Sequence, residues 1–218
     1  ARSENRDLAK ESRKSLALLA APKDLPEVVA LLAEQTSASA RGDLENILVA
    51  VARRIEDDGA KTAAILAGLK GDAPTKARAS LLDVLGRIGA ASGLPTLYAA
   101  IDGSDAEGQR AAVKTLAESW PDAVPMERLR AVSRTAENPV LRVLSLRGYA
   151  RMLAMPSRRS MKDTLALYQE ALGLAKGDQE KRTLVTGLGD LCHPDALAFV
   201  KPYLADPGVK NEALLSAL

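Results

Sequence analysis

Three arginines recur at an equal spacing, since Arg110 lies 32 residues after Arg78 and Arg142 lies 32 residues after Arg110. Seven residues after each arginine stands an apolar or small residue: Leu85, Ala117 and Tyr149. A repeat of this length is typical of proteins in which each unit is a helical hairpin. The spacing therefore restricts the chain to a repeat architecture before any single motif is considered.

The residues before these arginines predict where helices begin. Asp72, Asp105 and Asn138 have side chains that accept hydrogen bonds from the free N–H groups of a first helical turn. Pro139 supplies the fixed φ of a first helical position. Arg142 then lies in the first turn, where we expect it to contact the Asp or Asn side chain that caps a neighbouring unit. Repeated along the chain, such contacts would form a ladder of polar interactions between adjacent units.

The composition favours an all-α fold. Leu and Ala dominate the apolar residues and aromatic residues make up only 3%, whereas strands prefer β-branched and aromatic residues. No segment alternates apolar and polar residues for long enough to predict a strand. The expected helices span 5–20, 25–34, 42–56, 60–70, 73–89, 94–102, 106–119, 125–135, 139–154, 160–175, 178–190 and 194–204, with a last helix from 208.

One hairpin of this kind cannot bury its apolar face alone, so neighbouring hairpins must stack and form one continuous core. We expect a single domain over residues 1–218, an α-solenoid of about six stacked helical hairpins. The expected units are 1–39, 40–71, 72–104, 105–137, 138–177, 178–205 and a partial unit 206–218. Because the chain starts at Ala1 and ends within a helical pattern, we interpret it as a fragment of a larger protein.

Three stretches resemble a known family. The sequences "NPVLR" (138–142) and "DPGVK" (206–210) resemble the Asp-Pro-x-Val-Arg opening of HEAT repeats, especially the short bacterial HEAT-like type. The stretch "ASLLDVLGRIGAASGLPTLYAAIDGSD" (79–105) is similar to the helix–turn–helix core of that family. The resemblance implies a right-handed, armadillo-like α/α superhelix. Residues 138–177 depart from the pattern, because the unit is longer and "TLALYQEALGLAK" resembles a TPR helix.

The residues that could support catalysis are few. His193 is the only histidine, and we interpret it as a solvated residue at a helix start before Pro194. Cys192, the only cysteine, is expected to be a small buried residue at the end of a helix. A zinc site needs more His and Cys ligands than this chain has, and "GRIGAASG" follows a helix instead of the strand that a phosphate-binding loop requires. We therefore expect no catalytic residue, no metal site and no cofactor.

Cationic residues are concentrated in one part of the chain. Residues 126–182 contain 12 Lys and Arg against 6 Asp and Glu, a net charge of +6, although the whole chain has a net charge of +2. The candidates for contacting an acidic partner are Arg128, Arg130, Arg134, Arg147, Arg151, Arg158, Arg159 and Lys162. The alternative is a solvated face whose arginines form salt bridges and contacts between repeats. Aromatic residues that could stack on bases are missing from this patch apart from Tyr149, which the repeat places in the core, so the patch disfavours nucleic acid.

These observations favour a non-enzymatic repeat scaffold that binds another protein or a neighbouring domain of the parent chain. One alternative, implied by the resemblance, is an accessory or spacer domain of a larger bacterial multidomain protein that makes only intramolecular contacts. Another is weak binding of phosphate groups or other acidic partners through residues 126–182. No apolar run approaches the roughly 20 residues of a membrane helix, so we expect no membrane insertion. We expect a monomer, and the compartment stays undetermined because a targeting signal can lie outside this sequence.

Overall fold

The computed structural model describes residues 6–71 and 73–217, without the side chains of residues 6–10 and 14, and within this part of the chain it contains helices and short connections but no strand. The prediction of an all-α fold is confirmed. The helices divide into two compact units, Ala1–Pro121 (unit 1) and Asp122–Leu218 (unit 2). The boundary falls inside residues 105–137, which the sequence predicts as one hairpin. The expectation of one continuous solenoid over 1–218 stays a prediction.

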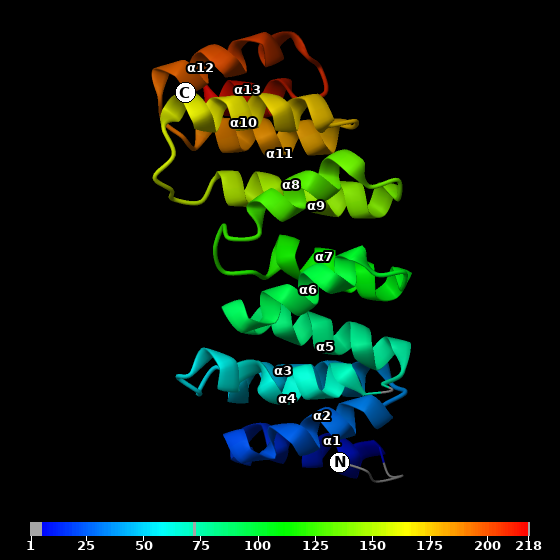
Figure 1. Ribbon diagram of the computed structural model, residues 1–218. Coiled ribbons are helices and arrows are strands. Elements are labelled where there is room, and N and C mark those ends of the chain that lie inside the picture. The colour runs from blue at the N-terminus through cyan, green and yellow to red at the C-terminus, as the bar shows by residue number, and fades with distance from the viewer. Residues whose placement is uncertain (1–5, 72, 218) are drawn as a thin grey trace. The chain divides into compact units, whose positions relative to one another are not determined.

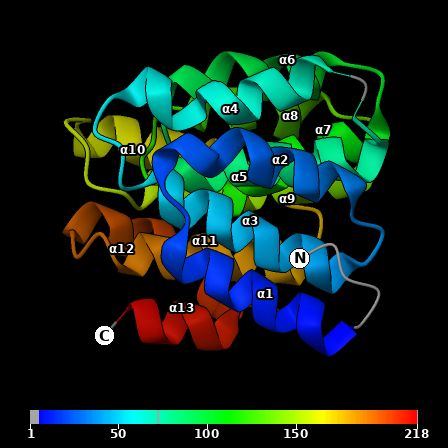
Figure 2. The ribbon, with the colours of Figure 1, turned by 90° about the horizontal axis from the view of Figure 1, so that it is seen from below.

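Unit 1 is built of α-helices joined by short connections, and two of these connections contain a 3₁₀ helix (Figure 1). The elements are α1 (Arg6–Leu19), η1 (Pro22–Asp24), α2 (Leu25–Glu34), α3 (Ala38–Ala52), α4 (Asp58–Lys70), α5 (Thr75–Ile88), η2 (Ala91–Gly93), α6 (Leu94–Asp102) and α7 (Ala106–Glu118). Helix α3 packs against both α1 and α5, and α5 packs against α7. Helix α2 packs against α4, and α4 and α6 lie along the same side of the unit (Figure 2). The helices α1, α3, α5 and α7 therefore contact one another in chain order, and α2 contacts α4.

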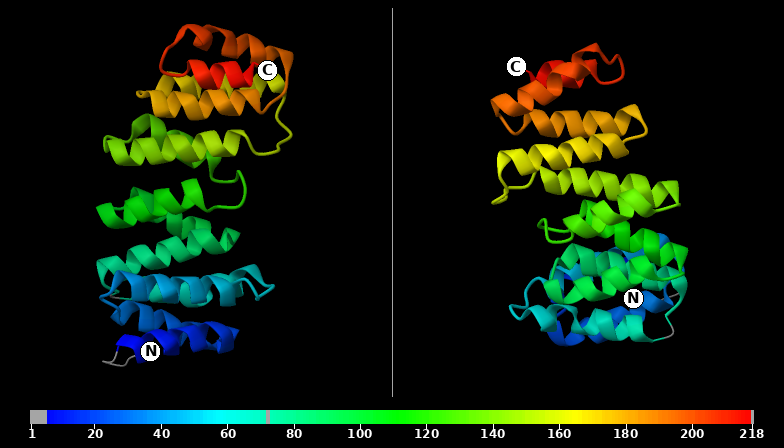
Figure 3. Two further views of the ribbon diagram at one scale, coloured as in Figure 1. Left: turned by 180° about the vertical axis from the view of Figure 1, so that it is seen from behind. Right: turned by 45° about the horizontal axis from the view of Figure 1, so that its top comes forward.

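Unit 2 repeats this arrangement (Figure 3). Its elements are α8 (Met126–Thr135), α9 (Pro139–Leu153), α10 (Met161–Leu174), α11 (Asp178–Gly189), α12 (Pro194–Val200), η3 (Lys201–Ala205) and α13 (Lys210–Ser216). Helix α11 packs against α9 and α13, while α8 and α10 both contact α9. Within each unit, the first helices of the hairpins thus form one layer, and the second helices lie on it.

Polar side chains begin the helices as the sequence predicts. Asp105 accepts a hydrogen bond from the Glu107 backbone N–H (3.1 Å), and Asn138 accepts one from Val140 N–H (2.9 Å). Both confirm the predicted N-caps. Asp72 lies outside the described residues, and α5 begins at Thr75 without a side-chain cap.

The start of α3 differs from the prediction. The helix begins at Ala38 instead of residue 42, because the Ser37 hydroxyl accepts a hydrogen bond from Ala40 N–H and caps the helix there. Asp43 therefore lies inside the helix. There it accepts a hydrogen bond from Arg13 Nε of α1 (3.0 Å) and links two helices of the same layer.

The expectation of a buried Cys192 is wrong. The thiol is exposed, because Cys192 lies just after α11 with a φ of 47°. This left-handed conformation ends helices and is usually adopted by glycine. His193, by contrast, begins α12 with its Nδ1 accepting a hydrogen bond from Asp195 N–H (3.2 Å), and its side chain is partly solvated as expected.

The core of each unit depends on close approach between helices of the first layer. Gly86 of α5 faces Thr115 of α7, and a Cβ placed on Gly86 would come within 2.1 Å of the Thr115 hydroxyl. That hydroxyl donates to the Asp83 carbonyl (3.1 Å), so it is buried with a partner. In unit 2, a Cβ on Gly189 would approach Ser216 to 2.6 Å, and the Ser216 hydroxyl donates to Val185 O (3.1 Å). The two units thus use the same contact: a glycine on one helix and a hydroxyl on the next helix of the layer.

We predict that Gly86→Ala destabilises the chain by about 2 kcal/mol, because the added methyl overpacks the contact with Thr115. Gly42→Ala is the matched control, since nothing lies within 4 Å of its added Cβ, and it should stabilise α3 by up to about 1 kcal/mol. Urea unfolding of the purified variants measures both effects. Equal stability of the two variants would contradict the proposed close contact.

Candidate functional site

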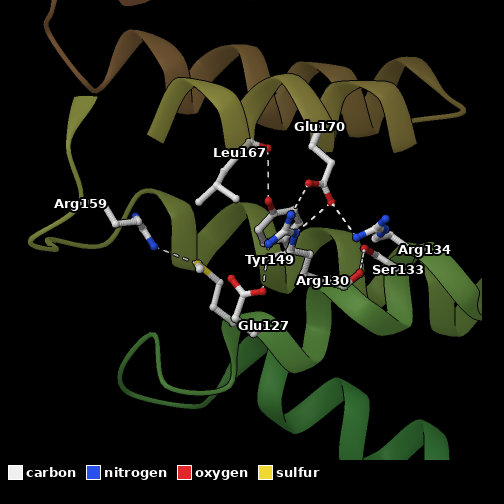
Figure 4. A network of polar contacts seen from close by, with 9 residues as sticks. Glu127, Arg130, Ser133, Arg134, Tyr149, Arg159, Leu167 and Glu170 are labelled. Atoms are coloured by element: carbon white, nitrogen blue, oxygen red, sulfur yellow. Dashed lines mark hydrogen bonds and ion pairs between the residues drawn. The ribbon is translucent and has the colours of Figure 1, made fainter. Parts of the chain in front are cut away.

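The most basic part of the sequence contains an ion network that joins α8 to α10 (Figure 4). Arg130 of α8 donates from Nε to Glu170 Oε1 (2.9 Å) and from Nη2 to Glu170 Oε2 (2.5 Å), a two-pronged contact with a residue of α10. Its Nη1 donates to Glu127 Oε2 (3.0 Å) on its own helix. The carboxylates raise the pKa of Arg130, and the hydrogen bonds from Arg130 lower the pKa of Glu170. Arg130 therefore stays protonated, and its positive charge is compensated by two carboxylates of the same unit.

Tyr149 of α9 lies beneath this network (Figure 4). It is fully buried, as the repeat predicts, and its hydroxyl donates to the Leu167 carbonyl of α10 (3.2 Å). Burial, together with the nearby Glu170 carboxylate, raises the pKa of Tyr149, so the phenol stays protonated. The tyrosine thus serves packing and a helix-to-helix hydrogen bond, and it offers no face for stacking.

Two further arginines of the predicted partner-binding set, Arg134 and Arg159, also contact residues of unit 2. Arg134 Nη1 lies 3.8 Å from Glu170 Oε1, with its side chain 56% exposed. Arg159, in the connection before α10, donates to the Leu153 carbonyl (3.0 Å) and to Met126 Sδ (3.0 Å). This second contact fixes the α9–α10 connection on the start of α8.

The remaining candidates lie on different elements. Arg147 on α9, Arg158 in the connection and Lys162 on α10 are exposed. Arg128 and Arg151 are half-buried, and burial lowers the pKa of Arg151. The predicted set is thus spread over α8, α9, α10 and the connection between α9 and α10, and its role in partner binding stays a prediction.

Arg142 does link neighbouring hairpins, but through different partners than expected. It donates to Glu180 Oε1 of α11 (3.0 Å) and to the Leu174 carbonyl at the end of α10 (3.1 Å). Glu180 also accepts hydrogen bonds from Lys176 N–H (2.6 Å) and Gly177 N–H (3.2 Å) before α11. The predicted contact with a capping Asp or Asn is wrong, because a carboxylate in the first turn reaches the arginine instead.

The predicted ladder is present only in part. Arg182 of α11 repeats the contact by donating to the Gly208 carbonyl (2.7 Å), with Nε 3.6 Å from Glu212 of α13. Arg78 instead donates to the Leu69 carbonyl (2.9 Å) at the end of the preceding helix. Arg110 is exposed and has no polar partner among the described residues. A shared position in the repeat therefore does not impose a shared partner.

Metal-ligating side chains do not cluster in the described part of the chain. Within residues 6–71 and 73–217, no group of three or more His, Cys, Asp or Glu could hold a metal ion. Tyr168 is buried against Gly187, where a Cβ would lie 2.7 Å from its hydroxyl, and this burial raises the pKa of Tyr168 to about 12. The phenol is therefore neutral near pH 7.

Unit 1 has an open groove between two second helices, here named the α4–α6 groove. It has a volume of about 550 Å³. Three leucines and two alanines provide its apolar surface, and its charged lining residues are two cations and one carboxylate. The lining residues are Leu66, Leu69, Lys70, Arg78, Leu82, Thr96, Ala99, Ala100, Gly103, Ser104, Asp105 and Gly108.

Unit 2 has a similar groove of about 510 Å³ at the same position in the predicted repeat, the α10–α12 groove. It is lined by Gln169, Leu172, Gly173, Ala198, Phe199, Pro202 and Tyr203. The two walls of each groove are 30 residues apart in sequence: Leu66 with Thr96 and Leu69 with Ala99 in unit 1, and Gln169 with Phe199 and Leu172 with Pro202 in unit 2. Neither groove is predicted from the sequence, although small residues at this offset, such as Ala99 and Gly173, are a signal that could have indicated them.

A third groove, of about 550 Å³, lies between the first helices α9 and α11. It includes the predicted candidate Arg151 together with Arg182, Asp190 and Glu212. Because its cationic and acidic residues are equal in number and Arg182 faces Glu212, this groove has no clear preference for a charged ligand.

We predict that Arg142→Met costs about 3 kcal/mol of folding stability, because it leaves the Glu180 carboxylate buried without its cation. Adding Glu180→Gln to this variant should recover part of the loss, since a neutral amide is less costly to bury. Arg147→Met on the same helix is the control and should change stability by less than about 0.5 kcal/mol. Denaturant unfolding checks all three; a loss no larger than in the control would refute the role of this ion pair.

A second prediction concerns pH. Because Arg130 lowers the pKa of Glu170 in the folded chain, the ion pair stabilises the fold above the unfolded pKa of about 4.3, and this stabilisation is lost as pH falls through the lowered value. Glu170→Gln should cost about 1 kcal/mol at pH 7 and almost nothing at about pH 2. The control Glu137→Gln changes an exposed carboxylate of the same unit. Thermal unfolding across this pH range tests the idea, which fails if the Glu170 variant shows the same deficit at both ends.

None of the described helices is both long enough and apolar enough to span a membrane. Comparison with models of known protein families finds no match to this chain, and comparison with curated proteins finds no similar sequence.

Proposed function

We propose that this chain is a non-enzymatic, HEAT-like α-solenoid scaffold that binds another protein through the second helices of its hairpins. The observation that supports it best is the recurrence of an open, mostly apolar groove at the same repeat position in each unit. Grooves of this size are typical of ligand and peptide sites. Grooves repeated along a solenoid suit an extended partner, because each repeat adds contact area.

The packing within each unit supports the solenoid part of the proposal. First helices pack in chain order, α1 on α3 on α5 on α7 and α9 on α11 on α13. Such nearest-neighbour layers are how α-solenoids bury their apolar faces. The ion pairs of Arg130 and Arg142 support the same proposal, because they join α8 to α10 and α9 to α11 within unit 2.

Variants that fill the grooves test the proposal. Gly173→Trp adds a ring to the α10–α12 groove at a position with nothing within 4 Å of its Cβ, and Ala99→Trp does the same at an exposed wall of the α4–α6 groove. Ala63→Trp is the control, since this exposed residue of α4 does not line the groove. We expect proteins captured from a lysate by the wild-type chain and the control to be lost with one of the groove variants.

Two results would argue against the scaffold proposal. Identical capture by all four chains, with folding verified by circular dichroism, would show that the grooves do not bind the partner. Turnover of a substrate by the purified chain would contradict the non-enzymatic part.

The ends of unit 1 and unit 2 favour a second candidate function, a spacer in contact with a neighbouring domain. Leu18 and Leu19 of α1 are 81% and 79% exposed, and Leu215 of α13 is 74% exposed. Contiguous exposed apolar residues mark contact sites, and Leu18 and Leu19 are adjacent in the sequence. If Leu19→Glu or Leu215→Glu abolishes capture while the groove variants do not, the spacer is favoured over the groove-binding scaffold.

A further inference from the structure

The three grooves differ in charge, and this difference indicates a partner for one of them. The α10–α12 groove has no charged lining residue, and the α9–α11 groove has two cationic residues and two acidic ones. The α4–α6 groove combines an apolar floor with Lys70 and Arg78, against the single acid Asp105. An apolar groove with excess positive charge favours a partner with the opposite sign.

Neither cation of the groove forms an ion pair with a carboxylate of the described residues. Lys70 is exposed in the last turn of α4, and no carboxylate of the described residues lies within ion-pair distance of it. Arg78, half-buried in the first turn of α5, donates one hydrogen bond from Nη1 to the Leu69 carbonyl (2.9 Å). A guanidinium has five N–H donors, so this bond leaves donors for a carboxylate in the groove.

The acid of the groove is already engaged. Asp105 caps α7 by accepting a hydrogen bond from Glu107 N–H (3.1 Å), and the positive end of the α7 dipole offsets its charge. It therefore competes weakly for Lys70 and Arg78.

The apolar part of the groove suits a helix. Leu66, Leu69 and Leu82 provide aliphatic surface, while Ala99 and Gly103 are small residues on the opposite wall. Small residues let a helix backbone approach closely, so larger aliphatic side chains of a partner can enter between α4 and α6.

We propose that the α4–α6 groove binds an acidic amphipathic helix of a partner protein, whose aliphatic face contacts the leucines and whose carboxylates pair with Lys70 and Arg78. The proposal rests on the proposed scaffold function and adds the chemistry of its partner.

Three labelled peptides of equal length test it with the full chain by fluorescence anisotropy. One has leucines at helical spacing with glutamate elsewhere, the second replaces glutamate by lysine, and the third replaces leucine by serine but keeps the glutamates. We expect only the Leu/Glu peptide to bind. Lys70→Glu should weaken its binding about fivefold, and Ala99→Trp should block the groove, whereas Lys76→Glu, an exposed control on α5 outside the groove, should change little.

Salt provides an independent readout. Binding of the Leu/Glu peptide should weaken as ionic strength rises, and this dependence should be smaller in Lys70→Glu. Equal binding of the Leu/Lys peptide, or unchanged affinity of Lys70→Glu, would overturn the preference for an acidic helix. Binding of the Ser/Glu peptide as tightly as the Leu/Glu peptide would overturn the apolar contact.

The peptide-binding result can be distinguished from the result of the capture experiment that tests the scaffold proposal. If none of the peptides binds but a protein partner is still lost with Ala99→Trp, the groove is an interaction site and the proposed partner chemistry is wrong. If capture is the same for all groove variants and no peptide binds, both proposals fail.

Discussion

Close approach between alternate helices is the constraint on which the rest of each unit depends. A Cβ at Gly86 or at Gly189 would overlap the next helix of the layer, so the distance between first helices is set by a glycine. The hydroxyl that faces it donates to a backbone carbonyl in both units; Thr115 is buried with this partner, and Ser216 is half-buried. These contacts fix the first layer, and the second helices lie side by side on it. The α4–α6 and α10–α12 grooves lie between neighbouring second helices.

Charge in this sequence is not the same as charge available for binding. Arg130 forms ion pairs with Glu170 and Glu127, and Arg142 forms one with Glu180, so fewer cationic side chains of residues 126–182 are open to a partner than their number suggests. The α4–α6 groove, in a part of the chain without excess charge, has the better-placed cations because its one acid caps a helix. The local arrangement of charges, more than their sum, determines where an acidic partner can bind.

The sequence predicted what depends on local rules. The expected helices 25–34 and 94–102 coincide with α2 and α6, and Asn138 and Asp105 are the caps that their side chains indicate. The sequence did not predict contacts and grooves that depend on a residue of another hairpin. The partner of Arg142 is a glutamate 38 residues later, and a groove forms only when residues 30 positions apart face each other. The predicted burial of Cys192 is wrong because this non-glycine residue adopts the left-handed conformation after α11, which leaves its thiol exposed.

The helix-to-helix contacts also determine how the chain reaches its native state. Thr115 contacts Asp83 across 32 positions, and Arg130 contacts Glu170 across 40, so each hydrogen bond closes a loop that is short compared with the whole chain. Low contact order of this kind is associated with rapid folding, because little loop entropy is lost before a contact forms. A nascent chain can therefore complete one hairpin against the previous one as it is synthesised, with no need to wait for its distant end.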